Sequence, residues 1–172
     1  MDNNFCNRKT MRAPNYDYNT PGTYFLTLCT RDKKCLLSNV VGNGVLDVPY
    51  IELTDYGKIA DKYINQMNHF YKHVSVERYV IMPNHIHMLL RVLEEDLESG
   101  SSRTPIPTRQ NSIVSLYVST FKRFCNKEYG TNIWQSHFYD RIIRDLEDYE
   151  THANYIYMNP IRWYNDELYS AF

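Results

Sequence analysis

The sequence predicts an α+β protein in which helices pack against an antiparallel β-sheet. Segments rich in β-branched and aromatic residues alternate with longer segments whose apolar residues recur at helical spacing. Two strand-like segments, 74–82 and 85–92, are separated only by Pro83 and Asn84, which predicts a β-hairpin in the middle of the chain. Because a hairpin pairs its strands antiparallel, it favours an antiparallel sheet.

The expected elements follow the order β, α, β, β, α, β, α. Outside the hairpin, strands are expected at 22–30 and 137–144, and helices at 53–71, 112–130 and 145–159. Thr54 suits the N-cap of the first helix, and Gly130 is typical of the end of the second. Segment 45–53 could add an edge strand, because Pro49 lacks the N–H that a central strand needs. The nearest standard pattern is the split βαβ arrangement of ferredoxin-like folds.

Length and composition indicate one domain. The chain has 172 residues, 43% of them hydrophobic and 23% charged, which is ordinary for a globular protein with a well-formed core. We expect residues 1–172 to form a single domain with a basic arm at 1–20 and a flexible loop at 94–111. The loop segment is acidic, then rich in glycine and serine, and then carries two prolines and two arginines.

The sequence points to an intracellular protein. The four cysteines, at 6, 29, 35 and 125, show no CxxC or zinc-finger spacing, which is typical of reduced thiols. The first residues lack the apolar core of a signal peptide, and no apolar stretch approaches the roughly 20 residues that span a membrane. We therefore expect a cytoplasmic protein.

The strand expected at 85–92 (HIHMLLRV) carries two histidines on one face. Residues two apart in a strand share a face, so His85 and His87 lie together while Ile86 and Met88 point to the core. Two imidazoles so placed can bind one metal ion. A bare His-x-His pair is more simply two half-exposed histidines on a sheet, so a metal site requires a third ligand and a nucleophile as support.

The helix expected at 145–159 offers candidates for both. At 3.6 residues per turn, one polar stripe contains Asp148, His152, Tyr155 and Asn159. A second stripe, which resembles a core face, contains Leu146, Tyr149, Ala153 and Tyr157. Tyr155 is therefore expected to point with the polar residues and Tyr157 with the apolar ones.

Pro160 bears on the end of this helix. It disfavours helical geometry at Asn159, so we expect the helix to end or bend there and to leave the Asn159 amide able to reach a metal. Taken singly, Tyr155 is most simply a surface phenol and Asn159 a helix breaker. Together with the histidine pair they form a coherent set of two imidazoles, one amide oxygen and one phenol.

These motifs resemble those of a known family. MPNHIHMLL (82–90) is similar to the HUH signature, His-hydrophobic-His, and YIYMNP (155–160) is similar to the tyrosine motif of the single-tyrosine HUH transposases. The resemblance is strongest to the REP-associated tyrosine transposases of bacteria and covers most of the chain. GTYFLTLCT, IWQSHFYDRIIRD and HANYIYMNP stand in the order and spacing of that family.

The resemblance implies a ferredoxin-like (RRM-like) sheet with the histidines on a central strand and the nucleophile, Tyr155, on a C-terminal helix. It implies that His85, His87 and Asn159 bind a metal, and Asn at the third position favours the REP-associated branch over the insertion-sequence branch. It also implies cleavage and strand transfer of single-stranded DNA through a 5′-phosphotyrosine, with a DNA partner that bears a hairpin. Relatives include monomers and homodimers, so either state is expected.

The residue types suit this chemistry. A phenol, with a pKa of about 10, is a weak nucleophile until it is deprotonated or oriented near a cation. Two imidazoles and an amide oxygen, with an oxygen-rich substrate, suit Mg²⁺ or Mn²⁺, and Ni²⁺ or Zn²⁺ could occupy the site in a preparation.

Basic residues gather in one part of a chain whose total charge is −1. Between residues 103 and 144 there are seven lysines and arginines against two acids. Such a surplus can direct a phosphate backbone to one face, although an ordinary solvated helix face at 122–127 fits the pattern equally well. The candidate DNA-binding residues are Lys122, Arg123, Lys127, Arg141 and Arg144.

Two other functions compete with this hypothesis. A histidine-triad phosphoesterase would need a further histidine at position 89, where Leu89 stands. A domesticated, non-catalytic nucleic-acid-binding module on the same fold is the stronger alternative, because one fold hosts many functions. Against it, all four residues that the cleavage chemistry needs are present.

Overall fold

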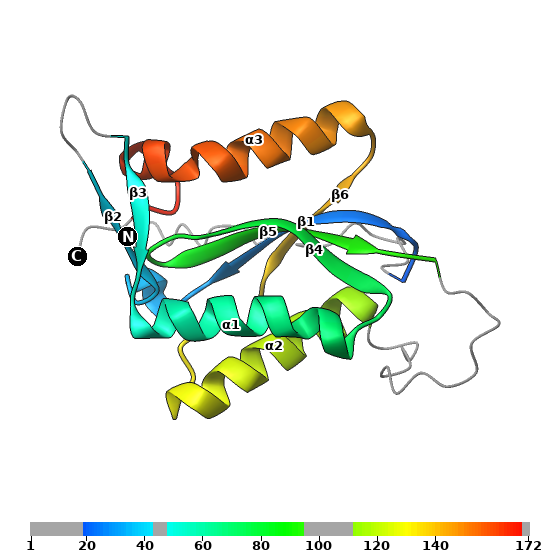
Figure 1. The fold of residues 1–172 in the computed structure, drawn as a ribbon, viewed down its shortest axis with the longest axis horizontal. Coiled ribbons are helices and arrows are strands. Elements are labelled where there is room, and N and C mark those ends of the chain that lie inside the picture. The colour runs from blue at the N-terminus through cyan, green and yellow to red at the C-terminus, as the bar shows by residue number, and fades with distance from the viewer. Residues whose placement is uncertain (1–18, 43–47, 95–111, 170–172) are drawn as a thin grey trace, which may run out of the picture.

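The computed structural model describes residues 19–42, 48–94 and 112–169. It forms an α+β fold with a four-stranded antiparallel sheet and three α-helices (Figure 1). The basic arm expected at 1–20 lies almost wholly outside the described residues, as does the loop expected at 94–111. None of the helices in the described ranges is long and apolar enough to cross a membrane.

The sheet has the strand order β4-β5-β1-β6. Its members are β1 (Gly22–Cys29), β4 (Val74–Ile81), β5 (His85–Val92) and β6 (Tyr139–Ile143). All three neighbouring pairs are antiparallel, and β4 and β5 form the hairpin that the sequence predicts. The histidine-bearing strand β5 is therefore central, with a neighbour on each side.

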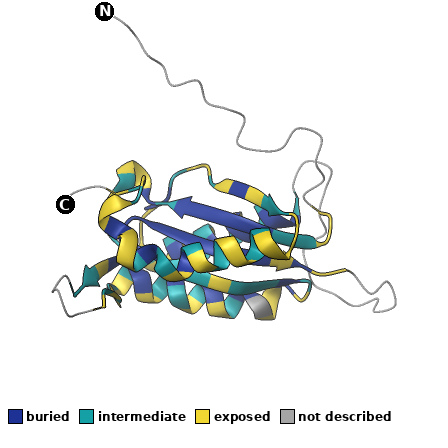
Figure 2. Ribbon diagram, turned by 90° about the horizontal axis from the view of Figure 1, so that it is seen from above, coloured by how far each residue is buried: buried dark blue, intermediate teal, exposed yellow. Residues whose placement is uncertain are grey.

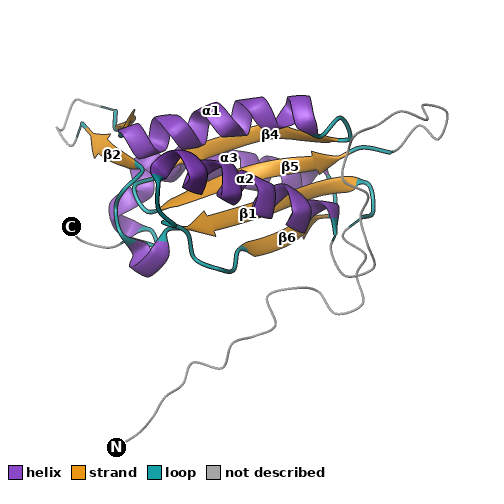
Figure 3. Ribbon diagram, turned by 90° about the horizontal axis from the view of Figure 1, so that it is seen from below, coloured by secondary structure: helices purple, strands orange, loops and turns teal. Residues whose placement is uncertain are grey.

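The helices lie on both faces of the sheet. Helices α1 (Asp55–Phe70) and α2 (Ile113–Tyr129) pack together on one face, and α3 (Leu146–Arg162) covers part of the other (Figures 1 and 3). The predicted boundaries of α1 and α2 are confirmed. Thr54 caps α1 by accepting the backbone N–H of Gly57, and α2 ends at Gly130 in a left-handed conformation.

Alternation along the two central strands separates two cores. The larger one lies under α1 and α2 and takes the even-numbered residues of β1 and β5, Tyr24, Leu26, Leu28, Ile86, Met88 and Leu90. The smaller one lies under α3 and contains Phe25, Leu89 and Ile156. Both faces of the central strands are therefore buried, as the dark strands of Figure 2 show. The histidines share the face of the smaller core, as predicted from strand periodicity.

Segment 45–53 does not join the four-stranded sheet. Its described end forms β3 (Tyr50–Leu53), which pairs antiparallel with β2 (Ser38–Val41) in a separate two-stranded sheet. No pattern in the sequence predicted β2 or the short 3₁₀ helices η1 (Arg31–Lys33) and η2 (Trp163–Asn165). A four-residue strand gives too short a pattern to recognise without its partner.

The expectation that α3 could end at Asn159 is wrong, and a bend there stays a prediction. The helix runs through Pro160 to Arg162. Proline inside a helix removes one hydrogen bond and costs about 3 kcal/mol. Ile156 and Trp163 are both buried on either side of it, and burying two such side chains offsets a cost of that size.

The apolar stripe predicted on α3 is also wrong in part. Tyr149 and Ala153 pack against the smaller core, but Tyr157 is 77% exposed and Leu146 is 71% exposed. The residues buried most deeply are Ile156 and Asn159. The helix lies over only part of the sheet face, so its buried side is narrower than the predicted stripe.

Gly57 allows α1 to approach the segment that follows β1. A Cβ atom at this position would overlap the carbonyl oxygen of Leu37 and press on the side chain of Leu53. The backbone N–H of Leu37 in turn donates to the carbonyl of Pro83, in the turn that precedes the two histidines. The close approach at Gly57 therefore helps to hold the start of β5.

We expect Gly57→Ala to lower the free energy of unfolding by about 1–3 kcal/mol, because the added methyl group has no room. At an unhindered helical position the same change raises the free energy of unfolding by up to about 1 kcal/mol. The sign of the measured change therefore tests whether Gly57 is closely packed. Urea unfolding of wild type, Gly57→Ala and the exposed control Lys58→Ala measures it. A stabilised Gly57→Ala variant would contradict the close approach.

Candidate metal and nucleophile site

His85 and His87 lie side by side within the protein. Both side chains are buried, and their ring centroids are 4.4 Å apart. Burial on a central strand differs from the half-exposed position that is ordinary for a histidine pair on a sheet. Two buried imidazoles in contact require a compensating interaction.

Hydrogen bonds orient both rings through Nδ1. His85 Nδ1 lies 2.8 Å from the amide oxygen of Asn84, and His87 Nδ1 lies 2.9 Å from the hydroxyl of Thr27 on β1. The Nε2 atoms of both histidines are buried and have no hydrogen-bond partner among the described residues. Such an arrangement, with one ring nitrogen hydrogen-bonded and the other left without a partner, is typical of metal-binding histidines.

Asn84 fixes the tautomer of His85. Its side-chain NH₂ donates to the backbone carbonyls of Lys33 (3.3 Å) and Leu168 (2.8 Å), so its oxygen faces His85. That oxygen can only accept, so the proton of the neutral ring sits on Nδ1 and the lone pair on Nε2. Lys33 presents its carbonyl from a left-handed backbone conformation with φ of 53°.

Burial keeps both rings neutral. It lowers the pKa of His85 to about 3 and also lowers the pKa of His87 well below its usual value. The nearby charge of each protonated ring would further disfavour protonation of the other. At neutral pH both histidines are therefore in the form that binds metals.

Helix α3 brings Asn159 and Tyr155 to the histidines. Asn159 is buried, its Oδ1 has no hydrogen-bond partner among the described residues, and its Nδ2 donates to Asp166 over 3.0 Å. The ring centroids of Tyr155 and His87 are 5.2 Å apart. Tyr155 of the predicted polar stripe therefore lies beside His87, and Asn159 is helical rather than terminal.

Asp166 is the site residue that sequence reasoning missed. Its Oδ2 accepts hydrogen bonds from the Tyr155 hydroxyl (3.1 Å) and from Asn159 (3.0 Å). One ligand atom each from His85, His87 and Asp166 lie within 4.8 Å of one another. Asp166 follows η2 in an irregular segment, where no periodicity assigns a side chain to a face.

The surroundings of Tyr155 oppose its ionisation. Burial and the negative charge of Asp166 raise the pKa of the phenol to about 12. The phenol is therefore protonated at neutral pH, and only a nearby positive charge would favour the phenolate.

The five candidate DNA-binding residues do not form one patch. Lys122, on α2, donates to the backbone carbonyls of Gln135 (2.7 Å) and His137 (3.1 Å), and burial lowers its pKa to about 8. Arg141 lies on the opposite face of the sheet, paired with Asp148 at 3.3 Å. Arg144 follows β6, and the other two residues, Arg123 and Lys127, are exposed on α2. Their role in DNA binding stays a prediction.

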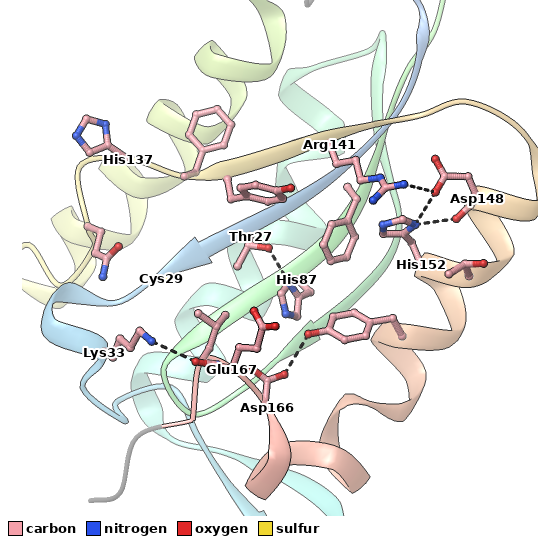
Figure 4. A pocket seen from close by; sticks show the side chains of 17 residues that line it. Thr27, Cys29, Lys33, His87, His137, Arg141, Asp148, His152, Asp166 and Glu167 are labelled. Atoms are coloured by element: carbon pink, nitrogen blue, oxygen red, sulfur yellow. Dashed lines mark hydrogen bonds and ion pairs between the residues drawn. The ribbon is translucent and has the colours of Figure 1, made fainter. Parts of the chain in front are cut away.

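A cavity of about 700 Å³ opens beside His87 (Figure 4). Tyr155 and Asp166 also line it, together with residues of β1, of β6 and the segment before it, of α3, and of the segment after η2. The site can therefore be reached by a ligand through this cavity.

Comparison with known proteins supports the resemblance found in the sequence. No protein-family model matches the chain. An uncharacterised protein of Haemophilus influenzae is 28% identical over 94% of this chain and 93% of its own length. A second protein of that organism, described as a candidate REP-associated tyrosine transposase, is 27% identical over 85% of this chain and 74% of its own length.

A solved structure has the same fold. It is that of a REP-associated tyrosine transposase bound to a REP hairpin, with a TM-score of 0.58 and 22% identity over 88% of this chain and 74% of that chain. The chain is homologous to the REP-associated tyrosine transposases. Like these transposases it has an α+β fold, and its histidine pair lies on a strand of the sheet.

The contacts of Asn84 in this transposase homologue predict its effect on metal binding. We expect Asn84→Ala to weaken Mn²⁺ binding about 10- to 100-fold, because His85 loses the acceptor that fixes its tautomer. Isothermal titration with Mn²⁺ measures the affinity. The control Asn154→Ala removes an exposed amide from α3 and should leave it unchanged. Equal affinities for wild type and Asn84→Ala would remove Asn84 from this role.

The depressed pKa of His85 predicts acid sensitivity of the metal-free protein. In the unfolded chain His85 takes up a proton as the pH falls below its ordinary pKa of about 6.5. In the folded protein it takes up that proton only near its lowered pKa of about 3, so the folded state loses stability as the pH falls from 6.5 towards 3. Between pH 7 and pH 5 the contribution of His85 is about 2 kcal/mol. Urea unfolding in EDTA measures it.

The control for this pH effect is a pair of variants. His85→Gln should reduce the dependence and leave the part that His87 contributes, whereas His69→Gln, on the exposed surface of α1, should keep all of it. The same slope in wild type and His85→Gln would mean that His85 is not responsible.

Proposed function

We propose that this protein is a metal-dependent transposase that cuts and rejoins single-stranded DNA through a 5′-phosphotyrosine on Tyr155. The observation that carries the proposal is that ligand atoms of His85, His87 and Asp166 lie within 4.8 Å of one another, and that Asp166 accepts the hydrogen bond of the Tyr155 phenol. The Nε2 atoms of both histidines and Oδ1 of Asn159 are also buried. Homology to REP-associated tyrosine transposases supports this reaction class.

The donor atoms fit a divalent metal. His85, His87 and Asn159 would hold it as the sequence analysis expects, and the carboxylate of Asp166 offers a further oxygen. Two neutral imidazoles with amide and carboxylate oxygens suit Mg²⁺ or Mn²⁺, and Ni²⁺ or Zn²⁺ could also bind. When bound, the ion would supply positive charge to neutralise the scissile phosphate and to lower the pKa of the phenol.

Tyr155 would act as the nucleophile. Its Oη would give its proton to the carboxylate of Asp166 and form a bond to phosphorus, while the bond from phosphorus to the 3′ oxygen breaks. The 3′ oxygen would take up a proton and leave as a hydroxyl. Asp166 accepts the hydrogen bond of the phenol and so orients Oη. Because the phosphotyrosine keeps the energy of the broken ester, the free 3′ hydroxyl of another strand can reverse the step and join DNA.

The partner we propose is single-stranded DNA that bears a hairpin, because a homologue was solved with a REP hairpin.

We further propose that the chain is one domain of the ferredoxin-like class, since its strand order β4-β5-β1-β6 with interspersed helices suits that arrangement. Its bacterial homologues favour a cytoplasmic protein that is nucleoid-associated when DNA-bound. Both a monomer and a homodimer are compatible with the site.

The alternative is a domesticated module that binds DNA without cutting it. Its favouring observation is the high pKa of Tyr155, about 12, which makes the phenol unreactive unless a cation is bound. The two functions differ in whether a covalent adduct forms.

The first test uses labelled single strands taken from the DNA that flanks the gene, incubated with Mn²⁺ and analysed on denaturing gels. Wild type should give a covalent protein–DNA band, and Tyr155→Phe should lower its yield at least about a thousand-fold, because it lacks the attacking oxygen. Binding of the same strands should survive, because the substitution removes one hydroxyl and keeps the aromatic ring.

Two further variants make this experiment decisive. Tyr157→Phe, whose hydroxyl is directed away from the site, should form the adduct normally. His85→Ala combined with His87→Ala should form none. An adduct retained by Tyr155→Phe would mean that another residue is the nucleophile. If wild type binds DNA but forms no adduct with either strand, the domesticated module is favoured.

A further inference from the structure

The face of the sheet that carries the histidines continues onto β1 and β6. In the register of the strands, Thr27 on β1 stands opposite His87 on one side and opposite Tyr139 on the other. In the same way Phe25 stands between Leu89 and Arg141. Residues opposite one another across a sheet share a face, so Tyr139 and Arg141 lie on the histidine side.

Helix α3 covers this part of the face only in part. It packs mainly against β4 and β5, and its residues Asp148, Thr151, His152 and Tyr155 form one wall of the cavity of about 700 Å³, which side chains of β1 and β6 also line (Figures 1 and 4). Tyr139 is 48% exposed although it belongs to a strand of the sheet, and Arg141 is exposed beside it. Phe25 is buried at the base of the cavity, stacked on His87 with ring centroids 5.0 Å apart.

The lining combines aromatic rings with charge of both signs. Lys33, Arg141 and His137 reach the cavity, as do Asp148, Asp166 and Glu167. Arg141 is paired with Asp148, and Lys33 donates to the backbone carbonyl of Glu167 over 3.4 Å. An aromatic surface bordered by hydrogen-bonding groups suits a flat heterocycle, and volumes of about 300–1,000 Å³ are typical of small-ligand pockets.

The wall of the cavity next to β6 is held in place from the other side of the sheet. Lys122 donates to the carbonyls of Gln135 and His137, the segment that leads into β6. Gln135 also donates its N–H to the carbonyl of Cys29 at the end of β1. The strand that presents Tyr139 is thus anchored at its start.

We propose that this cavity binds one unpaired nucleobase of the DNA strand next to the scissile phosphate, with Tyr139 as its stacking surface. The inference rests on the proposed function, which puts the phosphate between His87 and Tyr155. Tyr139 is two strands away from His87, roughly 10 Å at the spacing of neighbouring strands. A base on an adjoining nucleotide could span that distance. A base that is still paired in a duplex could not enter the cavity, so the cavity would select single-stranded DNA.

The test measures stacking without cleavage. Twelve-nucleotide single strands of thymine carry one 2-aminopurine, moved through successive positions, and are titrated with protein in EDTA. In wild type the fluorescence of the base should be quenched at a defined position. Tyr139→Ala should remove that quenching and weaken binding about tenfold, the effect of losing one stacked base. Because Tyr139 is half exposed, its loss should leave thermal unfolding unchanged.

Three variants separate stacking from other effects. Tyr139→Phe keeps the ring and should behave as wild type, as should Tyr50→Ala, which removes an exposed tyrosine from the two-stranded sheet. Tyr155→Phe should retain quenching although it forms no adduct. Quenching unchanged in Tyr139→Ala, or absent at every position in wild type, would overturn the base pocket. Normal quenching without an adduct would overturn the proposed reaction and leave the pocket standing.

Discussion

The structure depends on how two imidazoles are accommodated in the interior of the sheet. A buried polar atom without a partner costs of the order of 1–3 kcal/mol, and here His85 and His87 each leave Nε2 unpaired. The surroundings satisfy the other nitrogen of each ring, through Asn84 and Thr27, and direct the unsatisfied atoms to the same side. The sheet thus holds two imidazole nitrogens without a hydrogen-bond partner, and a cation bound by them would remove this energetic cost.

Several distant segments of the chain are needed to hold the two imidazoles and their neighbours in position. Asn84 is oriented by backbone carbonyls from η1 and from the segment after η2, at Lys33 and Leu168. Asp166 connects Tyr155 and Asn159 on α3. The histidine pair is therefore surrounded by polar groups that are themselves held, which limits the freedom of each ring. Preorganisation of this kind reduces the reordering that a bound ion or phosphate would otherwise require.

The parts of the site that lie on regular elements could be predicted from the sequence. A period of two assigned His85 and His87 to one face of β5, and a period of 3.6 assigned Tyr155 and Asn159 to one stripe of α3. The rest depends on contacts that no period encodes. Tyr157 is exposed because α3 covers only part of the sheet, and Asp166 arrives through an irregular segment. Pro160 stays helical because Ile156 and Trp163 are buried around it.

The order of the site residues along the chain has a consequence for synthesis. The two buried histidines belong to a hairpin in the middle of the sequence, whereas Tyr155, Asn159 and Asp166 come from its last part. A growing chain on the ribosome would have the imidazoles long before it has the phenol. Under the proposed function, a product interrupted before α3 would lack the nucleophile, so incomplete copies could not cut DNA.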